Sequence, residues 1–175
     1  MKRIKLENIS DKFFELSWTL YKDAFPLKMR RSKEVQALVI KNPLYNFDVF
    51  INEHGFIGFM FWWNFDNCSY IEHFAVSAVH RNRGLGKMIL EQFIYSHDKP
   101  VVLEVELPNT ALDKRRIKFY ETIGFKLNGH NYELPSLNDG KSVVPLLLMT
   151  YPDPFSKKEV EMFVAKYHPI ILELH

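Results

Sequence analysis

The sequence predicts one domain of the mixed α/β class, in which helices cover both faces of a central sheet. Strand-like segments follow one another between residues 47 and 76, which is typical of antiparallel strands joined by short turns. A helical segment then separates residues 69–76 from a further strand at 101–106, as in a β-α-β crossover. The chain has 175 residues, of which 47% are hydrophobic, so it can form a large core. We therefore expect a single domain over residues 1–175.

The N-terminal region is predicted to contain a strand and two helices. Residues 4–6 have the pattern of a short strand, and Ser10 or Asp11 can cap a helix from about residue 12 to residue 24. Ser32 is placed to cap a second, shorter helix. Apolar residues at helical spacing define the face of the first helix that we expect to be buried, which consists of Phe13, Leu16, Leu20 and Ala24.

The middle of the chain is predicted to be mainly β-structure. Residues 47–51, 56–65 and 69–76 are three strand-like segments separated by turn residues. A helix at about 87–96 and a strand at 101–106 follow them. The last of the three strands is apolar on both faces, so we expect it to be covered on both sides.

The C-terminal region is predicted to add two helices and two strands. A helix at about 113–123 ends at Gly124, a residue suited to the left-handed position after a helix. Residues 125–127 and 143–151 are the last predicted strands, with a polar loop between them. Ser156 begins a final helix, whose apolar face contains Val160, Phe163, Val164 and Tyr167. This face covers its own sheet or pairs with a second subunit, so a homodimer is one of two predicted arrangements.

The composition argues against several classes of partner. The formal net charge is only +2, so nothing favours nucleic acid or an anionic membrane surface. The longest apolar runs, 56–63 and 143–149, are too short to span a bilayer, and no apolar segment of a signal peptide follows the basic start. Cys68 is the only cysteine, which is typical of a reducing compartment. These features together predict a cytoplasmic protein. The seven histidines have no paired ligand spacing, so we expect no metal site.

The most informative segment is residues 81–87, with the sequence Arg-Asn-Arg-Gly-Leu-Gly-Lys. It joins a predicted strand to the start of a predicted helix. Free backbone N–H groups and the positive end of the helix dipole favour an anion at such a place. The two glycines allow a ligand to approach the backbone closely. The segment is therefore predicted to bind phosphate.

Two strands near this turn carry polar residues in apolar surroundings. Strict alternation would place Glu72 and His73 on opposite faces of the strand before the turn. Each of them is either a structural group of the core, with a hydrogen-bond partner, or a functional group. Glu104 and Glu106 share the face opposite to the apolar residues of their strand, so they face solvent or a ligand. Apolar neighbours would raise the pKa of such a carboxyl group and make it a usable base.

These residues together resemble a known family. Residues 71–76, followed by Arg-x-x-Gly-x-Gly over 81–86 at the start of a helix, resemble the signature of the GNAT superfamily of acyl-CoA-dependent N-acyltransferases. Asn109 and the run Phe-Tyr-Glu-Thr-Ile-Gly-Phe at 119–125 are similar to the family's later strand and helix. The strong resemblance covers about residues 69–125.

The resemblance implies a fold and a co-substrate. The fold is a mostly antiparallel sheet of about six to seven strands, splayed at one parallel pair, with helices on both faces. The co-substrate is acetyl-CoA, whose pantetheine arm would lie along Phe74, Ala75 and Val76. Asn109 is a usual cofactor contact, and an extra helical turn after it brings Arg116 near the cofactor's exit path. The diphosphate would be bound by Arg81, Asn82, Arg83, Gly84, Leu85, Gly86 and Lys87.

The resemblance also implies a reaction, the transfer of an acetyl group to a primary amine of a small molecule, an amino acid, or a peptide or protein N-terminus. A base must remove a proton from the attacking amine. Glu104 and Glu72 are the two candidates, and the sequence does not decide between them. Tyr120 matches the family's general acid, which protonates the leaving thiolate. Its alternative role is that of a packing residue with a polar tip.

The acceptor is the least defined part of the prediction. Arg30 and Arg31 in the loop between the first two helices, and Trp63 in the third strand, are the residues that we expect nearest to it. If they bind it, the acceptor has an apolar or aromatic body and a negative group. A second class of function is a non-catalytic acyl-CoA-binding regulatory module on the same fold. The presence of both candidate bases and the candidate acid argues against this second class.

Overall fold

The structure is a computed structural model, in which residues 1–173 are described. Its strands are β1 (Lys2–Leu6), β2 (Tyr45–Asn52), β3 (Gly55–Asn64), β4 (Ser69–Val76), β5 (Val101–Glu106), β6 (Lys126–Leu127), β7 (Tyr132–Pro135) and β8 (Val143–Tyr151). Its helices are α1 (Phe14–Ala24), α2 (Lys33–Val39), α3 (Leu85–Tyr95), α4 (Ala111–Glu121) and α5 (Lys157–Leu172), with short 3₁₀ turns η1 (Leu27–Met29) and η2 (Ala78–His80).

The strands form one mixed sheet in the order β1-β2-β3-β4-β5-β8-β6, and β7 also pairs with β8. Strand β4 runs parallel to β5, whereas the other paired strands are antiparallel. The crossover between the parallel strands is α3, as a β-α-β unit requires. The predicted fold class, a largely antiparallel sheet with one parallel pair, is confirmed.

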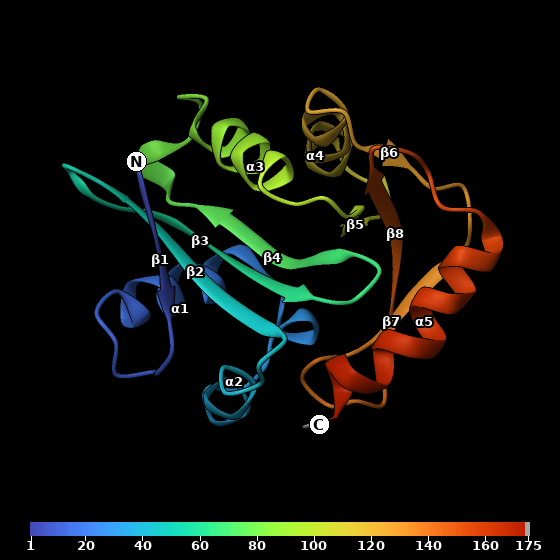
Figure 1. The fold of residues 1–175 in the computed structure, drawn as a ribbon, viewed down its shortest axis with the longest axis horizontal. Helices are drawn as coiled ribbons and strands as arrows, with labels where there is room; N and C mark the ends of the chain where they lie inside the picture. Colours follow the sequence, from blue (N-terminus) through green and yellow to red (C-terminus); the bar gives the residue numbers. More distant parts are fainter. Residues whose placement is uncertain (174–175) are drawn as a thin grey trace.

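Helices cover both faces of the sheet, as Figure 1 shows. One face packs against α1, α2 and α5, and the other against α3 and α4. Two separate clusters of buried residues therefore flank the sheet. We call them the α1/α5 core and the α3/α4 core, after helices that contribute to them.

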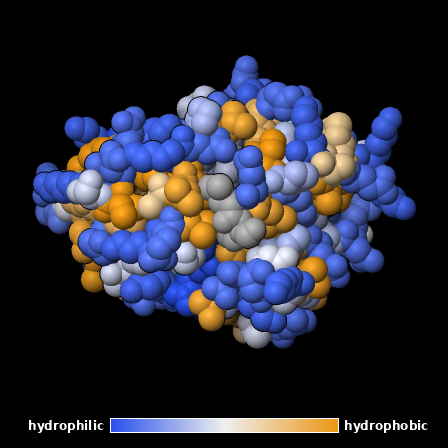
Figure 2. Space-filling model, turned by 90° about the horizontal axis from the view of Figure 1, so that it is seen from below, coloured by the Kyte–Doolittle hydropathy of each residue, from blue (hydrophilic) through white to orange (hydrophobic). Residues whose placement is uncertain are grey.

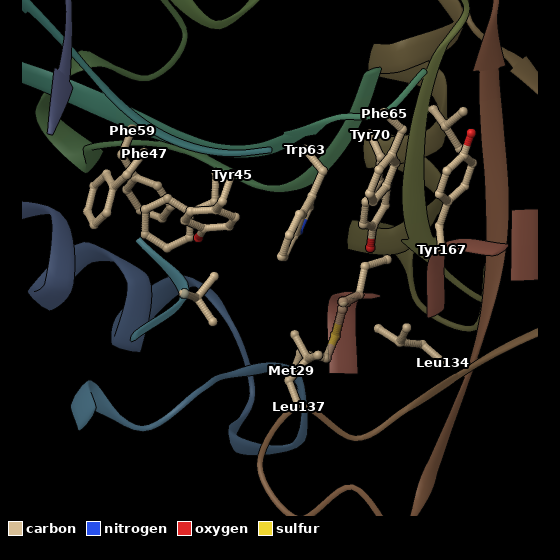
Figure 3. Close-up of a cluster of buried hydrophobic side chains, with 14 of the residues drawn as sticks. Met29, Tyr45, Phe47, Phe59, Trp63, Phe65, Tyr70, Leu134, Leu137 and Tyr167 are labelled. Carbon is tan, nitrogen blue, oxygen red and sulfur yellow. The ribbon is translucent and has the colours of Figure 1, made fainter. Parts of the chain in front are cut away.

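Aromatic rings fill much of the α1/α5 core. Figure 3 shows Tyr45, Phe47, Phe59 and Trp63 of the sheet above the loop residues that close the core from below. The rings of Phe47 and Phe61 lie 4.2 Å apart, edge to face. Such pairs add to the free energy of area burial. The high aromatic content of the sequence therefore serves mainly to build this core.

The structure corrects the predicted buried face of the first helix. Helix α1 buries Phe14, Trp18 and Tyr21, whereas Leu16, which we expected inside, is 53% exposed. The helix begins later than predicted because Phe13 takes a left-handed conformation, with φ of 76°, just before it. The side chain of Asp11, a predicted cap, instead accepts hydrogen bonds from the backbone of Glu7 and Asn8.

The predicted helix caps are otherwise confirmed. The Ser32 side chain accepts a hydrogen bond from the Val35 N–H. Gly124 has a φ of 108°, and Ser156 forms a capping box with Glu159 at the start of α5. The sequence analysis missed a second capping box, between Thr110 and Asp113, which begins α4. It also missed β7, which lies within the stretch that we expected to be a polar loop.

A β-bulge changes the faces of β4. Phe61 pairs with His73 and Trp62 pairs with Ile71, so Glu72 is an extra residue on β4. Both Glu72 and His73 consequently point into the α1/α5 side, where each contacts residues of the α1–α2 segment. The expectation that these two side chains lie on opposite faces is wrong, because strict alternation does not allow for an extra residue.

The surface is mostly polar. Figure 2 shows one face of the molecule, on which hydrophilic residues predominate and hydrophobic residues appear between them. Large apolar side chains that are exposed include Leu27, Leu38, Val79 and Tyr95. Over residues 1–173, no helix combines the length and the apolar character that crossing a membrane needs.

The contact between β3 and β4 depends on a glycine, which gives a first testable prediction. A Cβ atom on Gly58 would lie 2.3 Å from the carbonyl oxygen of Ala75, which is part of the β4 backbone and cannot rotate away. We expect Gly58→Ala to lower the free energy of unfolding by about 1–3 kcal/mol or more. Urea denaturation of the variant measures this change.

Gly129→Ala is the matched control, because a Cβ atom there meets nothing within 4 Å. We expect it to change the free energy of unfolding by no more than about 0.5 kcal/mol in either direction. Equal effects of the two substitutions would contradict the close contact of β3 with β4.

Candidate functional site

The two parallel strands separate part of the way along their length. Strand β4 pairs with β5 at Ser69, Tyr70 and Ile71, and the last pair joins Ile71 to Leu103. Beyond it the paired register ends, although both strands continue. Glu72 and Glu104 are the first residues past this point. The separation therefore brings both candidate bases to the start of a wedge in the sheet.

A turn and a helix N-terminus follow β4. Asn82 and Gly84 have φ angles of 59° and 74°, and Gly84 is the N-cap residue of α3. No side chain caps this helix, so its first N–H groups are left for another partner. The Arg81 side chain donates from Nε to the carbonyl oxygen of Val76 at 3.0 Å, which joins the turn to the end of β4.

The predicted phosphate-binding residues are brought together in this turn. Arg81, Asn82 and Arg83 are exposed, and no described acidic side chain forms an ion pair with either arginine. A Cβ atom on Gly86 would meet Phe119 and Val76 at ordinary contact distances of 3.5 and 3.6 Å. The turn thus combines free N–H groups, a helix dipole and exposed positive charge, a donor set that fits a diphosphate.

The edge of β4 beyond Ile71 lacks a neighbouring strand. Phe74 and Val76 pack towards the α3/α4 core, and Ala75 belongs to the α1/α5 core. Their register with β3 on the other side continues to Val76. An extended ligand can therefore lie along this edge and hydrogen-bond to the backbone, as an added strand does.

Glu104 lies at the wedge on the α1/α5 side. The hydroxyl of Tyr132, in β7, donates a hydrogen bond to Oε1 of Glu104. Burial raises the pKa of Glu104 to about 7, against the effect of this hydrogen bond, and the negative charge of Glu72 also raises it. A carboxyl group with this pKa exchanges a proton readily near neutral pH.

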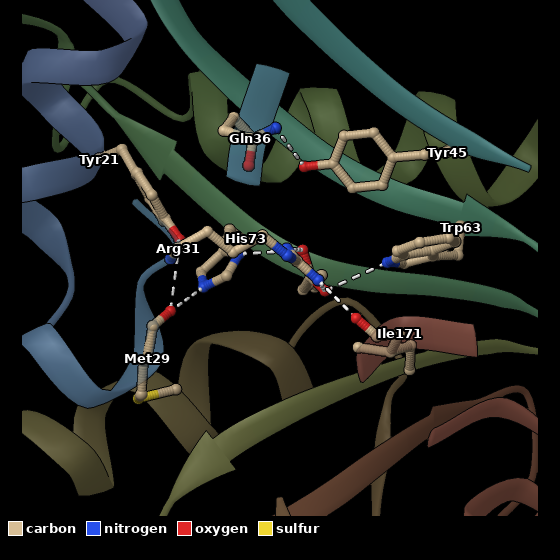
Figure 4. A network of polar contacts seen from close by, with 9 residues as sticks. Tyr21, Met29, Arg31, Gln36, Tyr45, Trp63, His73 and Ile171 are labelled. Carbon is tan, nitrogen blue, oxygen red and sulfur yellow. Dashed lines mark hydrogen bonds and ion pairs between the residues drawn. The ribbon is translucent and has the colours of Figure 1, made fainter. Parts of the chain in front are cut away.

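Glu72 is in a different electrostatic environment, shown in Figure 4. The Arg31 guanidinium binds both of its oxygens, with a distance of 2.7 Å from Nη2 to Oε1. Trp63 donates from Nε1 to Oε1 at 3.1 Å. Burial alone would raise the pKa of Glu72, but the charge of Arg31 and the hydrogen bonds from Arg31 and His73 together outweigh it and hold the pKa below the ordinary range. Glu72 therefore remains a carboxylate at neutral pH and is a weak base.

The same network joins distant parts of the chain. Arg31 also donates from Nη2 to the carbonyl oxygen of Ile171 at 3.2 Å, at the C-terminal end of α5. The guanidinium thus binds a carbonyl in the last turn of α5 and opposes the negative end of the helix dipole there. His73 Nε2 lies 2.7 Å from the carbonyl oxygen of Met29, in η1. The network thus holds the loop between α1 and α2 against both β4 and α5.

Tyr120 lies on the opposite face, in the α3/α4 core. Its side chain is buried against Phe119 and Phe125, and burial raises the pKa of its hydroxyl to about 12. Among the described residues, the Tyr120 hydroxyl has no hydrogen-bond partner. A protonated hydroxyl without such a partner suits both a proton donor and a packing residue.

Two further predicted cofactor residues lie around the start of α4. Asn109 is exposed just before the capping box of this helix. Arg116 forms an ion pair with Glu106, at the end of β5. Each is on the side of the wedge that carries α3 and α4, but Arg116 already has an acidic partner within the protein.

The predicted acceptor residues do not form a free subsite that could bind an anion. Arg31 and Trp63 are buried, and their polar atoms bind Glu72. Arg30 donates from Nη1 to the carbonyl oxygen of Lys22 at 3.1 Å and is partly buried. This geometry departs from the expectation that these residues meet a negative group of the acceptor.

The residues that surround Glu104 are not among the predicted site residues. Tyr132 lies in β7, a strand that the sequence did not predict, and His168 lies in the C-terminal half of α5. The hydroxyl of Tyr70 is buried beside Glu104, close enough to lower the pKa of that carboxyl group, but among residues 1–173 it has no partner in hydrogen-bond geometry. None of these residues belongs to a local motif, so no signal in the sequence pointed to them. Within the same residues, no group of three or more histidine, cysteine or acidic side chains could hold a metal ion.

Comparison with known proteins identifies the same segment that carries the sequence motifs. The model of an acetyltransferase (GNAT) domain matches residues 44–127. No curated protein sequence matches the chain significantly. A solved structure assigned to the GNAT family of acetyltransferases, from Bacteroides thetaiotaomicron, is 30% identical, covers 98% of each chain and superposes with a TM-score of 0.89.

Two more distant structures share the fold. An aminoglycoside 6'-N-acetyltransferase in complex with coenzyme A is 16% identical, with 90% of this chain and 100% of that chain covered and a TM-score of 0.63. A GNAT family acetyltransferase from Elizabethkingia anophelis with acetyl-CoA bound is 16% identical, with coverage of 85% and 95% and a TM-score of 0.56.

The Arg31–Glu72 pair gives a testable prediction of stability. We expect Glu72→Gln to lower the free energy of unfolding by about 3–5 kcal/mol, because it leaves a buried guanidinium charge unpaired. Arg31→Met should cost a similar amount, and the double variant should lose much less than the sum. Urea denaturation at neutral pH measures all three. Glu15→Gln, which breaks the exposed Lys33–Glu15 pair, is the control and should have little effect.

The same pair predicts an acid dependence. The folded-state pKa of Glu72 is depressed, so its contribution is complete above the ordinary glutamate pKa of about 4.3 and is lost as the pH falls below that value. Glu72→Gln should lack this part of the pH dependence. Parallel stability curves for wild type and variant between neutral pH and pH 3 would contradict the ion pair.

Proposed function

The chain belongs to the GNAT family of acetyltransferases, and on this premise we propose that it transfers the acetyl group of acetyl-CoA to a primary amine. The enzyme class follows from the family. The observation that carries the more specific proposal is the wedge between β4 and β5. It has an uncapped helix N-terminus on one side and a carboxyl group with a pKa of about 7 on the other.

Acetyl-CoA would supply an acyl group activated as a thioester. We assign its diphosphate to the turn from Arg81 to Lys87, where Gly84 opens the start of α3. We assign its pantetheine arm to the edge of β4 from Phe74 to Val76, which lacks a neighbouring strand. The coenzyme A and acetyl-CoA complexes of the two distant fold relatives support this choice of co-substrate.

Glu104 is the better candidate for the base. An acceptor amine is protonated at neutral pH and cannot attack until it loses a proton. The pKa of about 7 favours transfer of this proton to Glu104. Glu72 has a much lower pKa and both of its oxygens are bound by Arg31, so we assign it the role of holding the loop and α5 in place. Water between the amine and Glu104 can carry the proton where they do not touch.

Tyr120 is proposed as the acid that protonates the leaving thiolate. Its pKa of about 12 keeps the hydroxyl protonated at neutral pH, so that it holds a proton to give when the thiolate leaves. Tyr120 packs in the α3/α4 core, on the face of the sheet that α3 covers. The two proposed proton-transfer residues thus lie on opposite faces of the sheet, with the wedge between them.

The acceptor is proposed to be a small molecule, an amino acid or a peptide N-terminus with a primary amine. Arg31 is neutralised by Glu72 in the core, so it does not favour a negative group on the acceptor. Since the partly buried Glu104 is the group near the wedge that attracts a cation, a positively charged amine fits the site. We also infer that the chain acts as one domain in the cytoplasm, with its only cysteine buried.

The test of the function is thiol release from acetyl-CoA in the presence of amines, amino acids and peptides. We expect at least one acceptor to give turnover, with kcat/KM rising with pH through about 7 because Glu104 must be deprotonated. Glu104→Gln should lower kcat/KM by about 10²–10⁴-fold. Glu133→Gln, at an exposed position of β7, is the control and should retain activity. Calorimetry that finds no binding of acetyl-CoA by the wild type would end the proposal.

The assignment of Tyr120 has its own test. Tyr120→Phe should lower kcat by about 10²-fold or more, while the Kd for acetyl-CoA stays close to the wild-type value. The measurements are steady-state kinetics and isothermal titration with acetyl-CoA. Tyr95→Phe, at an exposed position of α3, serves as the control. Unchanged turnover in the Tyr120 variant would leave this tyrosine a packing residue.

A further inference from the structure

Three polar side chains from distant elements meet on the α1/α5 side of the wedge. Glu104 comes from β5, Tyr132 from β7 and His168 from the last turns of α5. The hydroxyl of Tyr132 donates to Oε1 of Glu104 and lies 2.8 Å from Nε2 of His168. Strands β5 and β7 pair with opposite edges of β8, so the tyrosine reaches across that strand.

We propose that Tyr132 and His168 are positioning residues that set the orientation and the proton affinity of Glu104. The proposal rests on the proposed function in so far as Glu104 is the base. It goes beyond that function by assigning a role to two residues that act through the base and not on the substrate itself. The chain of contacts runs from α5 through β7 to β5.

The direction of the two hydrogen bonds follows from the chemistry of the groups. A tyrosine hydroxyl has one hydrogen, and an ionised carboxylate only accepts. When Glu104 is ionised, Tyr132 must therefore donate to it, and its oxygen is left to accept from His168. Burial lowers the pKa of His168 to about 4, so the ring is neutral at pH 7. Its hydrogen must then be on Nε2, which fixes the tautomer.

This direction has a consequence for catalysis. Tyr132 takes one acceptor site on Oε1 of Glu104, so Oε2 is the less occupied of the two oxygens for the proton taken from the amine. The same hydrogen bond stabilises the charged form and opposes the effect of burial on the pKa. Without it the carboxyl group would hold its proton at neutral pH and would also be free to rotate.

The other groups around Glu104 contribute differently. The Tyr70 hydroxyl on β4 lies close enough to Glu104 to lower its pKa as well, although it does not reach hydrogen-bond geometry, and Glu72 is paired with Arg31. The residues of β8 opposite the contact, Leu146 and Leu148, are apolar and buried. Tyr132 is thus the one described residue whose hydroxyl is seen to donate to this carboxylate.

The test measures the pKa of Glu104 directly, with ¹³C-labelled glutamate followed by NMR against pH. The Glu104 signal is assigned by its loss in Glu104→Gln. We expect Tyr132→Phe to raise this pKa by about one unit, because a hydrogen bond to the charged form is lost. His168→Leu should shift it in the same direction, and His168→Gln, which keeps an N–H donor, should restore it towards the wild-type value.

Tyr167→Phe is the matched control. Its hydroxyl, also on α5, binds the carboxylate of Asp66 at 2.6 Å, away from β5. We expect it to leave the pKa of Glu104 unchanged. A Glu104 pKa that is the same in wild type and Tyr132→Phe would overturn the proposal, as would an equal shift in Tyr167→Phe. If Tyr132→Phe does not fold, the difference between His168→Leu and His168→Gln decides the question.

A second arm separates this proposal from the proposed function. The pH dependence of kcat/KM should move with the NMR pKa in Tyr132→Phe, which gives about a tenfold loss of kcat/KM below pH 7 and a smaller loss at pH 9. If the NMR pKa moves while the rate profile does not, the positioning chain stands and Glu104 is not the base. If neither moves, the chain is refuted and the base assignment is decided by Glu104→Gln alone.

Discussion

Arg31 holds the bulged part of β4 against the helical layer beneath the sheet. The bulge turns Glu72 and His73 to the same face, and the buried Glu72 carboxylate there needs a countercharge. The guanidinium supplies that countercharge and also binds the end of α5 at Ile171. Because one buried cation satisfies both groups, the loop after α1, the bulge and the C-terminal helix depend on one another. The wedge between β4 and β5 begins at this point, so its geometry depends on the same contact.

The two carboxyl groups at the wedge show how environment divides the roles of identical side chains. Glu72 and Glu104 occupy equivalent positions in neighbouring parallel strands, one residue past the last pair. Both are desolvated, which by itself raises the pKa of each. A fixed cation reverses the effect for Glu72, whereas Glu104 has only neutral donors. Opposite shifts of this kind separate a structural ion pair from a group that exchanges protons near neutral pH.

The sequence predicted the central strands well because their residues have a clear period and clear turn signals. The bounds of β4, β5 and β8 agree with the predicted ranges. The faces of Glu72 and His73 were beyond a rule of alternation, since an extra residue reverses every face that follows it. The sequence could not predict that Tyr132 and His168 lie beside Glu104, for another reason. They lie 28 and 64 residues from Glu104, and only the pairing of β7 with β8 and the packing of α5 bring them to it.

The last turns of α5 contact both halves of the wedge, through Ile171 on Arg31 and His168 on Tyr132. This has a practical consequence for work on the purified protein. An affinity tag placed directly after α5 would begin within a few residues of Ile171, next to the contacts that hold both carboxyl groups. A tag joined to Met1 would instead extend from the edge strand β1, at the far end of the sheet order. The N-terminus is therefore the safer place for a purification handle or a surface linker.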